Sequence, residues 1–209
     1  SVGCGSVSLC QQLIQITASV GDEVLFAWRS FEIYPLQVRT AGATPVPVPL
    51  ADHTHDLDAM LAAITDRTRL LIVNTPHNPT GAVYPRELLE ELVALCRSRG
   101  VLILADEVYD HLVYEGEHVS LRSVAGAEDI ALTVSSAGKA FAVTGWKVGW
   151  LTGPASGYDR RTALYTEDFL GYFKDAWPER WDKFAKANPN NPEGVLVQKL
   201  VRELEQDGT

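Results

Sequence analysis

The sequence predicts an α/β protein whose core is an open, mostly parallel sheet with helices on both faces, followed by a helical C-terminal tail. Three observations support this fold class. Short apolar runs rich in β-branched residues recur along the first 155 residues, a helical repeat separates two of them, and the composition changes near 153–157. Strand, helix and strand in alternation are typical of a layered α/β fold. We therefore expect a core at 1–155 and a tail at 156–209.

Four segments are expected to form strands. They are DEVLFAW at 22–28, RLLIVN at 69–74, VLILAD at 101–106 and IALTVS at 130–135. A parallel sheet that is covered on both faces buries its strands completely, so these strands appear in the sequence as continuous apolar runs. The four segments therefore predict neighbouring strands of one parallel sheet.

The segment PRELLEELVALCRSRG at 85–100 predicts a helix between the second and third strands. Pro85 stands near its start and Gly100 follows its end, which is the usual asymmetry of helix termini. Its apolar residues recur at helical spacing, as Leu88, Leu89, Leu92, Val93 and Cys96. This face of the helix is expected to pack on the sheet.

The tail is expected to be helical and to have a separate, unknown role. Aromatic residues recur every four positions at Phe169, Phe173, Trp177 and Trp181. Pro178 is expected to begin a second helix instead of lying inside the first. The segment VLVQKLVREL at 195–204 has the apolar repeat of an amphipathic helix.

Composition excludes several classes of protein. The net charge is −9 and the pI is about 5.0, which argues against a nucleic-acid-binding protein. There is no run of about 18 apolar residues, so no transmembrane helix is expected. The three cysteines, Cys4, Cys10 and Cys96, form neither a disulfide framework nor a zinc pattern. We therefore expect a cytoplasmic protein without membrane or nucleic-acid partners.

The histidine-rich segment DHTHD at 52–56 brings two histidines and flanking acids close together. It falls where a solvated loop between a strand and a helix is expected. We predict no metal site there or elsewhere. The sequence also begins on Ser1 in the middle of a recognisable pattern, and we expect further residues before it.

Polar side chains follow three of the predicted strands. Asp106 ends one strand and is followed by Tyr109, Asn78 follows another strand, and Ser136 and Lys139 follow a third. The carboxyl ends of parallel strands meet at one edge of a sheet, where ligands bind in α/β proteins. An acid, a phenol, an amide, a hydroxyl and an amine are therefore expected around one pocket.

Three blocks, NTPHNPTG, ADEVYDHLVYEG and SSAGKAFAVTGWKVGW, closely resemble the fold-type I pyridoxal-phosphate aminotransferases of class I/II. The opening GCGSVSLCQQL resembles aromatic-amino-acid and histidinol-phosphate aminotransferases, whereas the middle resembles the kynurenine and methionine aminotransferase branch. The resemblance covers 1–155. Members of that family are much longer, so it implies a truncated core with an unrelated tail from about residue 156.

The resemblance implies pyridoxal 5'-phosphate as the cofactor and assigns catalytic roles. Lys139 matches the lysine that bonds to the cofactor as a Schiff base, which requires a primary amine that can lose its proton, and that then carries protons. Asp106 matches the carboxylate that holds the pyridine nitrogen protonated. Tyr109 and Asn78 match the groups that hydrogen-bond the ring oxygen, and Phe31 matches the aromatic that stacks on the ring.

The resemblance also assigns residues to the cofactor's phosphate. Gly5, Ser6 and Val7 match the loop that opens the first helix, where free N–H groups and the helix dipole favour an anion. Ser136 and Lys147 match a hydroxyl and a basic position aimed at the same phosphate. Lys139 and Lys147 are the two lysines of residues 1–155, and this assignment gives each of them a purpose.

The function implied is amino transfer from an amino acid, aromatic or kynurenine-like, to a 2-oxo acid by a homodimer. Two alternatives stay open. A pyridoxal-phosphate-dependent β-lyase uses the same groups around the cofactor, and a non-catalytic cofactor-binding core fused to a helical interaction tail needs no chemistry at all. No residue of 156–209 matches the arginine that binds the substrate carboxylate in the family, since Arg160 and Arg161 lie too early in the chain.

Overall fold

The structure is a computed structural model that describes residues 2–153 and residue 186. Of these, residues 3–153 belong to one compact unit, Gly3–Gly157. The helices predicted for the tail lie outside the described residues. The boundary expected at 155/156 therefore stays a prediction.

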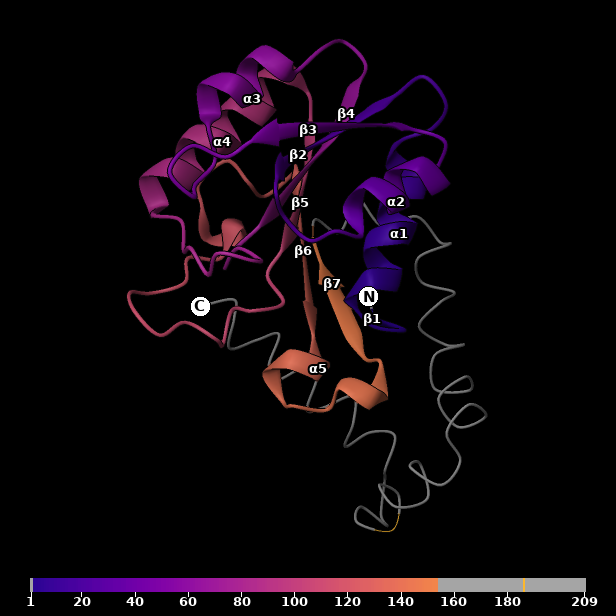
Figure 1. Cartoon of the computed structure of the whole chain (residues 1–209), viewed down its shortest axis with the longest axis vertical. Coiled ribbons are helices and arrows are strands. Elements are labelled where there is room, and N and C mark those ends of the chain that lie inside the picture. Colours follow the sequence, from indigo (N-terminus) through magenta and orange to yellow (C-terminus); the bar gives the residue numbers. More distant parts are fainter. Residues whose placement is uncertain (1, 154–185, 187–209) are drawn as a thin grey trace. The chain divides into compact units, whose positions relative to one another are not determined.

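The core is a seven-stranded sheet with the order β1-β7-β6-β5-β4-β2-β3 (Figure 1). The four strands β2, β4, β5 and β6 are the four predicted ones, each within one residue of the expected bounds. All pairs among β2 to β6 are parallel, and β7 runs antiparallel to β6. The strands are β1 (Val2–Gly3), β2 (Glu23–Trp28), β3 (Thr44–Pro49), β4 (Thr68–Asn74), β5 (Leu102–Asp106), β6 (Ala131–Ser136) and β7 (Gly149–Thr152).

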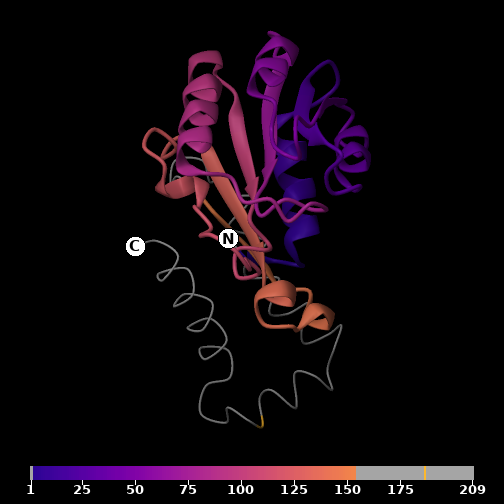
Figure 2. The same cartoon turned by 60° about the vertical axis from the view of Figure 1, so that its left-hand side comes forward.

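Helices cover both faces of this sheet, which confirms the predicted fold class (Figures 1 and 2). One face carries α1 (Ser6–Thr17) and α2 (Tyr34–Thr40), and the other carries α3 (Leu57–Ala63) and α4 (Arg86–Arg99). Short turns follow β5 and β6, namely η1 (Leu121–Ser123), α5 (Ala137–Ala140) and η2 (Thr144–Trp146). None of the helices in the described part of the chain combines the length and hydrophobicity that crossing a membrane demands.

The strands are buried on both sides, as their apolar runs predict. Leu71 and Val73 of β4 join the core cluster beneath α3 and α4. Alternate residues of a strand point to opposite faces, so Leu70 and Ile72 lie beneath α1 and α2, and both are at most 1% exposed. One strand thus contributes to two apolar layers.

The bounds of α4 follow the predicted termini. Pro85 is the residue before the first turn, and Gly100 ends the helix in the left-handed conformation with φ 65°. Glycine adopts this conformation without the steric cost that a side chain adds. The predicted apolar face is buried at Leu89, Leu92, Val93 and Cys96.

The edge strand β3 was not predicted, because its sequence TPVPVP has proline at every second position. Proline lacks an N–H and is confined to edge strands and bulges. The flanking Thr44 and Leu50 donate their N–H groups to the carbonyls of Asp22 and Trp28 on the β2 side. Alternate residues of a strand share one side, so the even-numbered residues from Thr44 to Leu50 turn their N–H groups toward β2. The prolines are odd-numbered and therefore face away from β2.

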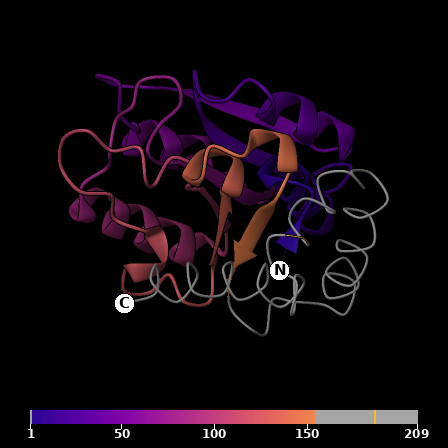
Figure 3. The same ribbon diagram turned by 90° about the horizontal axis from the view of Figure 1, so that it is seen from below.

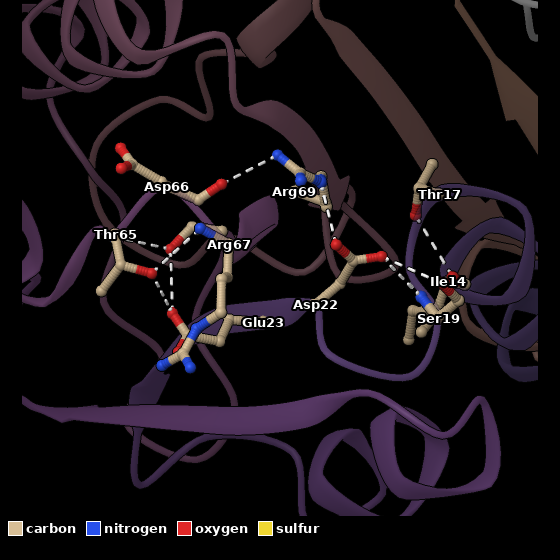
Figure 4. Close-up of polar contacts among 10 residues, drawn as sticks. Ile14, Thr17, Ser19, Asp22, Glu23, Thr65, Asp66, Arg67 and Arg69 are labelled. Carbon is tan, nitrogen blue, oxygen red and sulfur yellow. Dashed lines mark hydrogen bonds and ion pairs between the residues drawn. The ribbon is translucent and has the colours of Figure 1, made fainter.

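Polar contacts hold the amino ends of β2 and β4 together (Figure 4). Arg67 forms an ion pair with Glu23, which also accepts a hydrogen bond of 2.6 Å from the Thr65 hydroxyl. Arg69 pairs with Asp22 at 3.0 Å. These groups lie at the opposite end of the strands from Asp106, so their role is structural.

The expectation of a solvated segment at 52–56 was wrong for His55, which is only 4% exposed. Its ring packs perpendicular to Tyr84, with 4.4 Å between centroids. Burial lowers the pKa of His55 to about 3, so the ring is neutral. Asp56 of the same segment begins α3 by accepting a hydrogen bond from the Ala59 N–H. Within residues 2–153 and at residue 186, no three potential ligands of a metal ion gather.

Candidate active site

A pocket of about 850 Å³ opens at the carboxyl ends of β4, β5 and β6. Figure 3 views this end of the sheet, with α5 toward the viewer. All ten residues that the sequence analysis assigned to a cofactor site line this one pocket. They are Gly5, Ser6, Val7, Phe31, Asn78, Asp106, Tyr109, Ser136, Lys139 and Lys147.

Asp106 is the one acid among the described residues that line the pocket, and it is buried at 3% exposure. Tyr34 Oη donates a hydrogen bond of 2.6 Å to Oδ2, and the Val108 N–H lies 3.4 Å from Oδ1. Burial raises the pKa of Asp106 to about 6, although the bond from Tyr34 works in the opposite direction. Among the described residues Oδ1 has a single weak partner, so it remains available to a donor in the pocket.

Asn74 connects Asp106 to the loop that carries Asn78. It ends β4 directly opposite Asp106 in the register of the parallel pair. Its Nδ2 donates to the Asp106 carbonyl at 2.9 Å, while its Oδ1 accepts from the Asn78 N–H at 2.7 Å. One amide thus positions the Asn78 loop relative to the acid.

Lys139 lies in α5, the short turn that follows β6. Ser136 begins this turn, with its Oγ accepting a hydrogen bond of 3.3 Å from the Gly138 N–H. Lys139 Nζ is 5.4 Å from the centroid of the Tyr109 ring, close enough for a cation–π contact. The amine and the phenol therefore share one wall of the pocket.

The other end of the pocket is formed by the amino terminus of α1. Gly5 precedes the helix with φ 81° and has no side chain to cap the free N–H groups of the first turn. Such a helix end attracts anions. Ser6 and Val7 lie in that turn, and the backbone of Lys147 is 3.7 Å from the position of a Cβ on Gly5.

Gly149 of β7 allows this close approach. A Cβ at position 149 would lie 2.5 Å from the Ser6 nitrogen and 2.6 Å from the Gly5 carbonyl carbon. No side chain fits at such distances. Glycine at this position therefore permits the last strand to run against the helix end that borders the pocket.

Sequence reasoning missed four residues that shape the pocket: Tyr34, Gln37, Asn74 and Gly149. Asn74 left a signal, because it is a polar residue at the carboxyl end of an apolar run. Tyr34 comes three residues after Phe31, and the two rings meet edge to face at 5.6 Å. Gly149 and Gln37 left no such signal, since their roles depend on contacts between elements distant in the chain.

Comparison with known proteins identifies the family. The sequence profile of aminotransferase class I and II matches residues 1–171, which extends past the boundary expected at 155/156. The aromatic amino acid aminotransferase of Mycobacterium sp. (strain KMS) is 54% identical over 155 residues, which are 74% of this chain and 43% of the relative.

Two solved structures have the same fold. N-succinyldiaminopimelate aminotransferase from Mycobacterium tuberculosis matches with a TM-score of 0.75 and 31% identity, covering 98% of this chain and 54% of that protein. A mutant aspartate aminotransferase of Thermus thermophilus matches with a TM-score of 0.71 and 37% identity, covering 83% and 46%. The chain thus spans about half the length of the proteins it resembles. It belongs to the class I and II aminotransferase family.

Proposed function

We propose that this chain forms the cofactor-binding core of an aminotransferase that moves an amino group from an aromatic amino acid to a 2-oxo acid. One observation carries the proposal. A buried acid, an exposed lysine and an uncapped helix end line the same pocket, which is large enough for a small cofactor. The identity of 54% to an aromatic amino acid aminotransferase supports the choice of donor.

The residues of the pocket fit pyridoxal 5'-phosphate. Asp106 has one carboxylate oxygen without a strong partner, which suits a pyridine N–H. The amino end of α1 and Lys147 suit a phosphate, and Ser136 adds a hydroxyl beside them. Phe31 offers an aromatic face, and pyridoxal phosphate supplies, when bound, an electron sink for negative charge at the substrate's Cα.

Each residue then has a defined task. Lys139 Nζ would bond the cofactor covalently, and as a free amine it would move a proton at the substrate's Cα. Such proton transfer contributes about 10²–10⁴-fold to a rate. Tyr109 and Asn78 would donate hydrogen bonds to the ring oxygen. Asp106 would keep the pyridine nitrogen protonated, since its pKa of about 6 leaves it mostly ionised at neutral pH.

We further propose that the enzyme works as a homodimer in the cytoplasm. The free thiols of Cys4, Cys10 and Cys96 support a reducing compartment. Exposed apolar side chains along α1 and α2, such as Ile16 at 60% and Leu36 at 57%, support an interface on this side of the fold.

The test is a comparison of the purified chain with Lys139→Ala after addition of pyridoxal phosphate. The wild-type chain should show the visible absorbance band of covalently bound cofactor, and the variant should lack it. Addition of an aromatic amino acid should then convert the band only in the wild type. Release of ammonia without a 2-oxo acid would instead indicate a β-lyase. A band of equal strength in both chains would contradict the proposal.

A further inference from the structure

Two buried side chains of α2 contact opposite ends of the pocket. Tyr34 and Gln37 are three residues apart, so they lie on the same face of this seven-residue helix. Both are buried, at 1% and 3% exposure. Neither was assigned to the cofactor by the sequence analysis, although Gln37 lines the pocket.

At one end, Tyr34 acts on the acid. Its Oη donates to Asp106 Oδ2 at 2.6 Å. Other titratable groups that act on Asp106 or Tyr34 are Cys10 from α1, Glu107 directly after β5, and Tyr109. Burial and the charge of Asp106 raise the pKa of both Tyr34 and Cys10, so these two groups stay neutral and Tyr34 remains a donor. The bond leaves Asp106 Oδ1 directed to other partners.

At the other end, Gln37 acts on the helix terminus. Its Nε2 donates to the carbonyl of Val7 at 2.7 Å, in the first turn of α1. In return, Gln11 Nε2 of α1 donates to the Gln37 carbonyl at 3.2 Å. These two bonds run in opposite directions between the helices, so they fix the rotation of the first turn of α1 as well as its distance from α2.

We propose that α2 is a brace that sets the spacing between the acid and the anion-binding helix end of the pocket. Tyr34 and Gln37 are the positioning residues. The inference rests on the function proposed above, because the spacing matters for a ligand with a pyridine nitrogen at one end and a phosphate at the other. Short hydrogen bonds from one rigid turn hold both ends at once, which preorganises the pocket before the ligand arrives.

The effects of Tyr34 and Gln37 can be distinguished by comparing the affinities for two ligands, pyridoxal and pyridoxal phosphate. Tyr34→Phe should weaken pyridoxal and pyridoxal phosphate by the same factor, roughly tenfold, because the nitrogen is common to both. Gln37→Met should weaken pyridoxal phosphate by roughly tenfold and leave pyridoxal, which lacks the phosphate, unchanged. Equilibrium titrations of the full chain by fluorescence measure both affinities.

The fold supplies matched controls. Tyr84 is buried to the same degree as Tyr34, at 1% exposure, but its hydroxyl has no hydrogen-bond partner among the described residues. Thr40 lies on α2, and among the described residues its hydroxyl donates only to the Leu36 carbonyl of its own helix, at 2.8 Å. Tyr84→Phe and Thr40→Val should leave both affinities at their wild-type values.

A second readout needs no ligand. The Asp106 carboxyl, followed by carbon-13 NMR in the unliganded chain, should titrate at a higher pH in Tyr34→Phe, and at an unchanged pH in Tyr84→Phe and Gln37→Met. If the wild-type chain binds neither ligand, the proposed function fails, and this titration still tests the bond from Tyr34. The proposed brace would be overturned if Gln37→Met weakened both ligands equally, or if the titration of Asp106 did not shift in Tyr34→Phe. Loss of the folded circular dichroism spectrum in either variant would also overturn it.

Discussion

At the scale of single residues, the pocket sets an ionised acid in an apolar environment. The pKa of Asp106 in the folded chain, about 6, lies above its ordinary value near 4 because burial favours the neutral form. Above pH 6 the folded chain therefore carries a charge that the unfolded chain solvates more easily. Asp106 destabilises the empty fold there, and this cost disappears as the pH falls through 6 toward 4.

Asp106→Asn should accordingly stabilise the unliganded chain while it weakens the cofactor. The amide keeps an oxygen that can accept from Tyr34 and carries no charge. We expect a gain of about 1–3 kcal/mol at pH 7 and almost none at pH 4, measured by urea unfolding at both values. Affinity for pyridoxal phosphate should fall in the same variant. A loss of stability at pH 7 would show that the charge is better compensated than its burial indicates.

Lys147 is expected to act on the phosphate through its charge. Lys147→Met should reduce the affinity for pyridoxal phosphate roughly 10–150-fold, since a charge-assisted hydrogen bond contributes about 1.5–3 kcal/mol. Affinity for pyridoxal should not change. Lys147→Arg, which keeps the charge, is the control and should retain most of the affinity. Equal affinities of Lys147→Met and the wild type for pyridoxal phosphate would place the lysine outside the phosphate site.

The individual site residues could be predicted only where the chain itself groups them. Asp106 and Tyr109 share one short block, as do Ser136 and Lys139, and each block follows a strand. Tyr34 donates a hydrogen bond to Asp106, which lies 72 residues away in the sequence, and Gln37 donates one to Val7, which lies 30 residues away. Contacts of this kind depend on which helix packs over which strand, and no local pattern contains that information.

At the scale of elements, β7 and the amino end of α1 approach each other closely at Gly149. Gly149→Ala would place a methyl group 2.5 Å from the Ser6 nitrogen, which forces the strand and the helix end apart. We expect a loss of about 1–3 kcal/mol in stability, as for other overpacked sites, together with a weaker affinity for pyridoxal phosphate.

The control for this substitution is Gly21→Ala. Gly21 has φ 95°, and no described residue beyond its two chain neighbours lies within 4 Å of a new Cβ, so its substitution costs backbone strain alone. Both variants should lower the midpoint of thermal unfolding, but only Gly149→Ala should change the affinity for the cofactor. Unchanged binding in Gly149→Ala would mean that the helix end tolerates displacement.

Strands and helices could be predicted from the sequence where a single pattern, such as an apolar run or an amphipathic repeat, determined the choice of residues. The strands β2, β4, β5 and β6 are buried on both sides, so their sequences are uninterrupted apolar runs. The amphipathic face and termini of α4 are equally plain. In β3 the proline repeat conceals a strand, and only its place at the edge of the sheet makes that sequence acceptable. The antiparallel direction of β7 follows from the short turn through α5 and η2, whose geometry the sequence does not reveal.

At the scale of the whole molecule, His55 should make the fold sensitive to acid. The unfolded chain binds a proton at His55 near pH 6.5, whereas the folded chain resists it until about pH 3. Stability is thus fully present above pH 6.5 and is lost as the pH falls below it. His55→Phe should remove this loss, so between pH 7 and pH 5 the variant should lose about 2 kcal/mol less than the wild type.

Urea unfolding at several pH values measures the difference. His53→Asn, at an exposed position of the same loop, is the control and should follow the wild type. Because Asp106 titrates in the opposite sense over part of this range, the comparison between variants is more informative than either curve alone. Parallel curves for His55→Phe and the wild type would assign the acid sensitivity to other groups.

The proline repeat of β3 determines how this sheet can grow. Its outer side presents carbonyl oxygens but no amide hydrogens at Pro45, Pro47 and Pro49, so an incoming strand would find half of its partners missing. A second molecule cannot extend the sheet there by edge-to-edge pairing. The repeat thus opposes fibrillar assembly at this edge of the sheet.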